Sequence, residues 1–71
     1  MKLTWTFEEG DEGLLIDDIY QCNELPMVHI QATDGVFLVW ECWDDMTFHV
    51  LSEFPDLNQA IWYVQKRHKE G

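Results

Sequence analysis

The chain almost lacks positive charge. Of its 71 residues, 14 are Asp or Glu and only four are Lys or Arg, so the formal net charge is −10 at pH 7. No Lys or Arg occurs between Leu3 and Gln65, a stretch that holds every acid except Glu70. Proteins that bind nucleic acid directly neutralise its phosphates with Lys and Arg. The composition therefore argues against direct nucleic-acid binding and favours a positively charged partner.

Long apolar runs are also missing. No stretch approaches the ~18 consecutive apolar residues that a membrane span needs, and the first residues do not form the apolar run of a signal peptide. We expect a cytoplasmic protein that does not contact a membrane, in the host cytoplasm if a phage encodes it. Cys22 and Cys42 are too few for a disulfide framework and lack CxxC spacing. We expect two free, buried thiols, with a single disulfide as the alternative.

What the chain does contain is apolar and aromatic. Hydrophobic residues make up 46% of it, including four Trp, four Phe and two Tyr, which excludes intrinsic disorder. At this length we expect one domain over residues 1–71. Self-repulsion among so many acids costs stability, and solubility alone requires fewer. Adaptation to high salt could produce the same charge, but the aromatic content fits that explanation poorly.

Alternation of apolar and polar residues predicts a sheet. Residues 3–8 alternate in this way and predict a strand with one apolar face. Residues 27–33 and 36–43 flank Asp34-Gly35, a dipeptide typical of two-residue hairpin turns. Residues 46–51 then follow as the third strand of a meander.

Two helices complete the predicted fold. Residues 14–22 fit a short helix, because their apolar side chains share one arc and paired Asp residues form strands poorly, with a strand as the alternative. Residues 57–68 carry an apolar stripe after Asp56, a good N-cap. Basic residues near the end of this helix complement its dipole: Lys66, Arg67 and Lys69. The prediction is an α+β fold, with an antiparallel β-meander of three to four strands and the C-terminal helix packed on one face.

Two-residue turns would set the register of this sheet. They place His29 opposite Trp40, and Trp40 opposite His49, in a row across the open face, whereas Glu41 is the one misfit on the helix-covered face. The two His residues would lie roughly 10 Å apart, too far to bind one metal ion. The Glu9 and Asp11 spacing also lacks the ligand pattern of a calcium loop. We expect no metal, no cofactor and no catalytic site, and therefore no enzyme.

The candidate partner-binding residues are mostly acidic. Dense carboxylates lie early in the chain, and two Trp residues join them as apolar contacts. Trp62 faces away from the helix stripe, and Trp is enriched at interaction hot spots. Cover by the N-terminal segment, by Tyr20 or by the stem of Lys66 is the alternative. The full set is Glu8, Glu9, Asp11, Glu12, Asp17, Asp18, Trp40 and Trp62.

These observations favour a non-enzymatic inhibitor. The acids would occupy the basic surface with which a partner protein binds DNA or RNA, as nucleic-acid mimics do. Small acidic inhibitors of restriction and CRISPR systems, made by phages and mobile elements, have this general composition. The alternative is an adaptor or homodimerisation module that binds a protein through the open sheet face around Leu38, Trp40 and Leu51.

Overall fold

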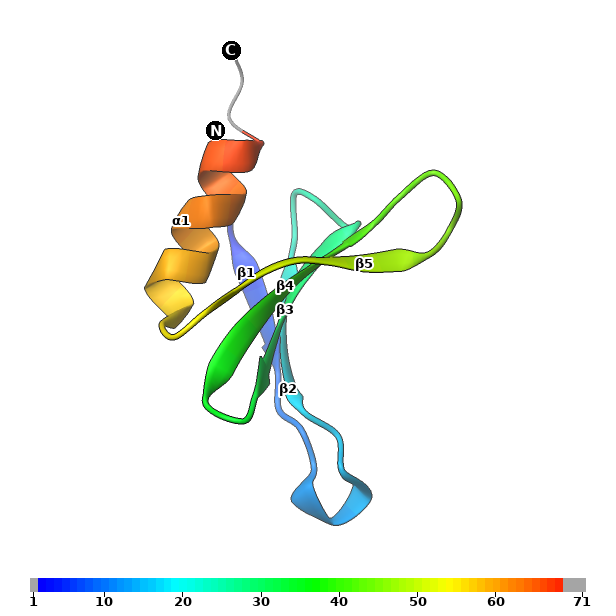
Figure 1. Cartoon of the computed structure of the whole chain (residues 1–71), viewed down its shortest axis with the longest axis vertical. Coiled ribbons are helices and arrows are strands. Elements are labelled where there is room, and N and C mark those ends of the chain that lie inside the picture. Colours follow the sequence, from blue (N-terminus) through cyan, green and yellow to red (C-terminus); the bar gives the residue numbers. More distant parts are fainter. Residues whose placement is uncertain (1, 69–71) are drawn as a thin grey trace.

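Five strands and one helix follow one another along the chain in the computed structural model, which describes residues 2–68 (Figure 1). The strands are β1 (Trp5–Glu8), β2 (Asp18–Cys22), β3 (Val28–Thr33), β4 (Val36–Cys42) and β5 (Phe48–Phe54). A short 3-10 helix, η1 (Glu12–Leu14), lies between β1 and β2, and the helix α1 (Leu57–Arg67) follows β5. Each strand pairs antiparallel with its neighbour in the order β1-β2-β3-β4-β5. The predicted α+β meander with a C-terminal helix is confirmed, with five strands in place of three to four.

The fifth strand comes from the segment predicted to be helical. In place of a helix over residues 14–22, the backbone turns through η1, and β2 pairs with β1 on one side and β3 on the other. Two hydrogen-bonded ladders complete the backbone of a central strand, and this tertiary pairing outweighs the local helical pattern. The acids that argued against a strand are hydrogen-bonded at its start: Gly10 N donates to Asp18, and Gln31 Nε2 donates to Asp17.

The β3–β4 hairpin has the predicted register. Asp34 and Gly35 both have positive φ, 50° and 79°, as a two-residue turn of this kind requires. His29 therefore lies opposite Trp40, as expected.

The β4–β5 hairpin does not have the predicted register, because its loop is one residue longer. Met46 N donates to the Trp43 carbonyl, Trp43 N donates to the Thr47 carbonyl, and Met46 adopts a left-handed φ of 65°. These features describe a three-residue loop closed by a left-handed residue. Trp40 consequently pairs with Val50, while His49 pairs with Glu41.

Strand β5 is also longer than expected and irregular. It runs to Phe54 rather than ending at Leu51, and its register shifts at a bulge beside Val39 and Trp40. Leu51 packs against the core rather than lying on the open face predicted for it, because the longer β4–β5 loop places Val50 opposite Trp40 and so turns Leu51 to the other face.

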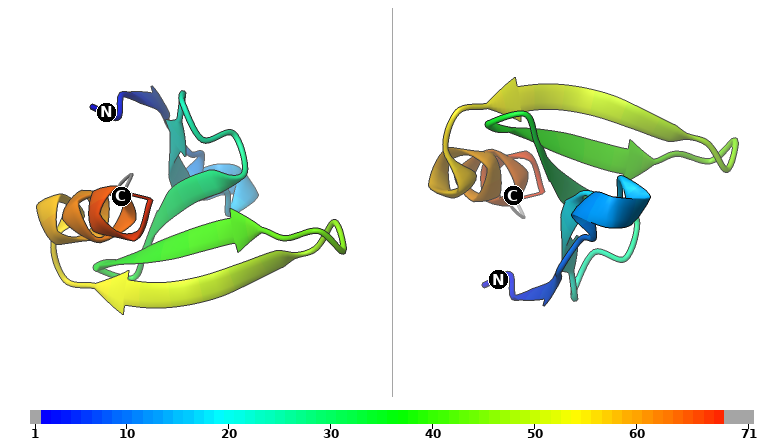
Figure 2. Two further views of the ribbon diagram at one scale, coloured as in Figure 1. Left: turned by 90° about the horizontal axis from the view of Figure 1, so that it is seen from above. Right: turned by 90° about the horizontal axis from the view of Figure 1, so that it is seen from below.

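The core lies between α1 and one face of the sheet (Figure 2). The predicted apolar stripe of the helix is confirmed, because Ala60 and Val64 are buried and Leu57 and Ile61 pack against the core. Asp56 caps α1 by accepting from Asn58 N at 2.9 Å. The buried apolar residues are Leu3, Cys22, Val28, Ile30, Val39, Ala60 and Val64.

Glu41, the misfit in the sequence pattern, joins the sheet to the end of α1. It is buried and accepts hydrogen bonds from Arg67, at 3.4 Å to each carboxylate oxygen, and from Trp43 Nε1 at 3.1 Å. His68 Nε2 lies 2.9 Å from Glu41 Oε2. Part of the helix's positive charge is thereby neutralised inside the fold. Lys69, predicted to complement the helix dipole, lies outside the described residues.

Both cysteines are free thiols, as predicted, although only Cys22 is fully buried. Burial raises the pKa of the Cys22 thiol, which keeps it protonated and unreactive at neutral pH. No helix among residues 2–68 has the length and apolar character needed to cross a membrane.

Candidate protein-binding surfaces

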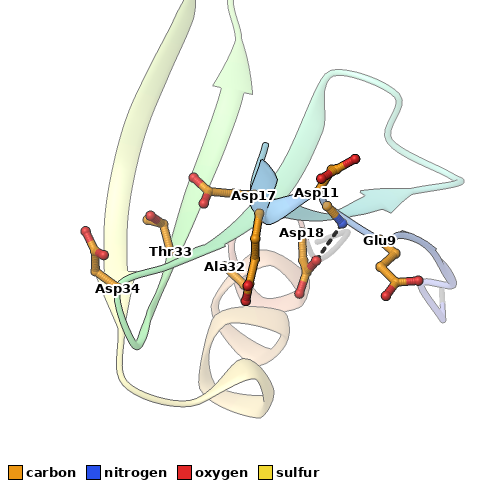
Figure 3. Close-up of a pocket in the computed structure, with 9 residues that line it drawn as sticks. Glu9, Asp11, Asp17, Asp18, Ala32, Thr33 and Asp34 are labelled. Carbon is orange, nitrogen blue, oxygen red and sulfur yellow. Dashed lines mark hydrogen bonds between the residues drawn. The ribbon is translucent and has the colours of Figure 1, made fainter. Parts of the chain in front are cut away.

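Carboxylates from three separate segments surround one open hollow at an end of the sheet (Figure 3). The hollow has a volume of about 490 Å³. Its acidic members come from the β1–η1 connection, the start of β2 and the β3–β4 hairpin. We call this surface the acidic hollow, and its acids are Glu9, Asp11, Glu12, Asp17, Asp18 and Asp34.

Gly10 lets the two sides of the β1–β2 connection approach closely at the hollow. A Cβ atom at this position would lie 2.1 Å from the carbonyl oxygen of Ile16 and 2.6 Å from the carbonyl carbon of Asp17. Backbone atoms cannot move aside cheaply, so only glycine fits here. The Gly10 N–H donates to Asp18 Oδ1 at 2.6 Å, which holds the two acidic segments together.

The loop between β1 and β2 is closed by backbone hydrogen bonds. Asp11 N donates to the Ile16 carbonyl at 2.8 Å, and Ile16 N donates to the Asp11 carbonyl at 2.9 Å. The side chain of Asp11 accepts from Gly13 N at 2.9 Å and caps η1. The 3-10 helix η1 ends at Leu15, its C-cap, which is in a left-handed conformation with φ of 57°.

The acids of the hollow divide into structural and free members. Asp11, Asp17 and Asp18 accept hydrogen bonds from other parts of the chain. Within residues 2–68, Glu9 and Glu12 form no side-chain hydrogen bond, and the ion pairs of this part of the chain involve Glu41 and Asp45 instead. The charge of the acidic hollow is therefore not neutralised by any cation that the structure describes.

Five of the six acids predicted in the early segment line the acidic hollow. Of the six acids predicted in the early segment, Glu8 lies apart from the hollow, on β1 opposite Ile19. Asp34 was assigned only a turn role, yet it lines the hollow. The pairing of Asp18 with Ala32 brings the β3–β4 turn to this end of the sheet, and that register could be derived only after β2 was known to be a strand.

The two predicted Trp contacts lie elsewhere. Trp62 is 61% exposed on α1, with Lys66 Nζ 4.8 Å from its ring centroid, so the predicted cover by Lys66 is present but partial. Neither Trp62 nor Trp40 lines the acidic hollow, and Figure 1 shows α1 and η1 at opposite ends of the fold. The predicted residues therefore do not form a single site.

Trp40 lies on the open sheet face, in an aromatic group centred on His29. His29 stacks parallel to Trp40 at 6.0 Å between centroids, and Phe48 meets His29 edge-on at 5.2 Å. Phe48 and Val50 are each about half exposed. We call His29, Trp40, Phe48 and Val50 the open-face patch; burial within it lowers the pKa of His29.

The predicted row of His29, Trp40 and His49 is wrong in its third member. Because the β4–β5 loop is one residue longer, His49 turns to the other face and stacks on Trp43 at 3.8 Å. The open-face patch and the acidic hollow are nevertheless connected. Trp40 Nε1 donates to Gln31 Oε1 at 2.9 Å, and Gln31 Nε2 donates to Asp17 at 2.6 Å.

Carboxylates line one of the two surfaces, and aromatic and apolar side chains line the other. In the part of the chain that the structure describes, no three His, Cys, Asp or Glu side chains are arranged to hold a metal ion. In comparisons with known proteins, no family model, curated protein or solved structure matches the chain.

Proposed function

We propose that this protein is a non-enzymatic inhibitor that binds the basic, nucleic-acid-binding surface of a partner protein and blocks it. One observation carries the proposal: six carboxylates from three segments surround a single hollow, and no cation among residues 2–68 pairs with them. A surface this far from charge balance attracts positively charged partners, and it does so over long range at low salt.

The acidic hollow is also held in shape before binding. Its segments are tied by the Gly10–Asp18 and Gln31–Asp17 hydrogen bonds and by the backbone bridge between Asp11 and Ile16. A partner would therefore meet the Asp11, Asp17 and Asp18 carboxylates already positioned, with little conformational entropy lost on binding them. Such a surface can compete with the phosphates of a nucleic acid for the same Lys and Arg side chains.

A charge-matched pair of variants tests this function. The first variant changes Glu9→Gln, Asp11→Asn and Glu12→Gln, which keeps the Asp11 acceptor and removes three charges from the hollow. The control changes Asp44→Asn, Asp45→Asn and Glu53→Gln, which removes three charges from the β4–β5 hairpin. Each protein is used to capture partners from a nuclease-treated bacterial lysate at low and high salt, and captured proteins are tested for DNA or RNA binding with and without the inhibitor.

We expect the unaltered protein and the control to capture a nucleic-acid-binding protein at low salt and to inhibit its nucleic-acid binding. The hollow variant should do both at least about tenfold more weakly, since each charge contact that is lost contributes on the order of 0.5–1 kcal/mol. Equal loss in the two variants would mean that only net charge matters, and the proposal would then be wrong.

A second candidate function is supported by the open-face patch. Phe48 and Val50 remain half exposed beside Trp40, as expected of an adaptor or dimerisation face. Its contact would persist at high salt and would be lost with Phe48→Ser. Binding through the acidic hollow would instead be lost at high salt and would survive Phe48→Ser. Sedimentation of the free protein at high salt distinguishes a homodimer from an adaptor.

A further inference from the structure

The loop that carries the acidic hollow also ends in an exposed apolar tip. Leu14, Leu15 and Ile16 are 69%, 90% and 54% exposed, and Figure 1 shows their loop projecting from the end of the sheet. We call these three residues the apolar tip. These side chains are not buried within this chain, so they contribute little hydrophobic stabilisation to the fold. Polar residues at the same positions would make the protein more soluble.

The apolar tip is held in a defined conformation. The backbone pairs Asp11 with Ile16, and Leu14 N and Leu15 N donate to the carbonyls of Asp11 and Glu12 at 3.1 and 3.2 Å. Leu15 is kept in the left-handed region although leucine disfavours it. The backbone that carries these side chains is therefore ordered before binding, which reduces the entropy cost of inserting them into a partner.

The surrounding charge selects the kind of partner. Glu9, Asp11 and Glu12 lie on one side of the tip in the sequence, and Asp17 and Asp18 lie on the other. A second copy docking tip to tip would bring these like charges together, and an anionic membrane would repel them. A basic protein surface would attract them while its own apolar recess covered the leucines.

We propose that the apolar tip inserts into an apolar recess bordered by Lys and Arg on the partner protein. This inference rests on the proposed function and adds to it, because charge brings the partner to the acidic hollow and the tip then selects it. Proteins with basic surfaces but no recess would bind only weakly and would be released by salt.

Two peptides of equal charge provide the test. One alternates Lys with Leu, the other alternates Lys with Ser, and their affinities are measured by fluorescence anisotropy at several salt concentrations. The tip variant is Leu14→Ser with Leu15→Asn, which leaves every charge in place. Met46→Asn is the matched control, since Met46 is also left-handed and 83% exposed but lies in the β4–β5 loop. Circular dichroism checks that each variant is folded.

We expect the unaltered protein and Met46→Asn to bind the Lys-Leu peptide at least about tenfold more tightly than the Lys-Ser peptide, the factor expected from covering one leucine. The tip variant should lose this preference and keep its affinity for the Lys-Ser peptide. The hollow variant with Glu9, Asp11 and Glu12 neutralised should weaken binding to both peptides.

Other outcomes separate the inference from the function on which it rests. Equal, salt-sensitive affinity for both peptides would overturn the tip inference and leave the proposed function standing. Absence of salt-sensitive binding to either peptide would overturn both. Three further results would overturn the inference. A preference that survives in the tip variant would place the apolar contact elsewhere on the protein. A dimer that depends on the tip, or tip-dependent binding to phosphatidylcholine vesicles, would mean that the tip binds a second copy or a lipid surface instead of a basic protein.

Discussion

Replacing Leu15 with Asn should make the protein more stable. Leu15 has a φ of 57°, and the left-handed conformation costs an ordinary L-residue about 1–2 kcal/mol, a cost that Asn largely avoids. With its side chain 90% exposed, Leu15 loses little burial, about 0.2–0.3 kcal/mol from a full value of roughly 1.5–3. We expect a net gain of about 0.5–1 kcal/mol, which corresponds to about 2–8 °C in Tm for a domain of this size.

Thermal unfolding followed by circular dichroism measures this gain, and two further variants isolate its cause. Met46→Asn should give a similar gain, because Met46 has a φ of 65° and is also largely exposed. Leu15→Ala should have little effect, since Ala keeps the unfavourable conformation. If Leu15→Asn lowers Tm while Met46→Asn raises it, the leucine side chain stabilises the fold and our reasoning about the apolar tip is wrong. A gain in stability with a loss of peptide selectivity would show that the leucine is kept at the expense of stability.

Three other perturbations follow from particular contacts. Gly10→Ala should destabilise the protein by more than about 1 kcal/mol, because the new Cβ meets backbone atoms of Ile16 and Asp17. The amide NMR signals of residues 10–18 should also shift. An unchanged Tm would contradict the close approach of the backbone at Gly10. Glu41→Gln should cost about 1–2 kcal/mol in chemical denaturation, with the half-exposed Arg67 limiting the loss. Burial opposes the charge on Glu41, but hydrogen bonds from Arg67 and His68 outweigh it and hold the pKa of Glu41 below its usual value. The contribution of ionised Glu41 to the free energy of unfolding should therefore be complete above about pH 4.3, the usual pKa of Glu in an unfolded chain. It should disappear as the pH falls through the lower pKa of the folded state, so the unaltered protein and Glu41→Gln should have similar stabilities in acid. A difference that stays constant down to low pH would exclude this ion pair as the cause.

Local signals account for the parts of the fold that were predicted well. Asp34-Gly35 specifies a tight turn because both residues accept positive φ, and the β3–β4 register then follows by alternation. The helix stripe and the Asp56 cap are equally local. The segment over residues 14–22 was predicted wrongly because its strand character depends on pairing with two distant strands, which a helical wheel does not describe.

The composition by itself determined that the protein is acidic, folded and rich in aromatics, and that its charge gap runs from Leu3 to Gln65. Tertiary structure decided which acids lie together, because only the β2–β3 pairing brings Asp34 to the same hollow as Asp17 and Asp18. It also decided that Leu14, Leu15 and Ile16 face solvent rather than a core. Charge and hydrophobicity are properties of residues, whereas a binding surface depends on the register that places those residues side by side.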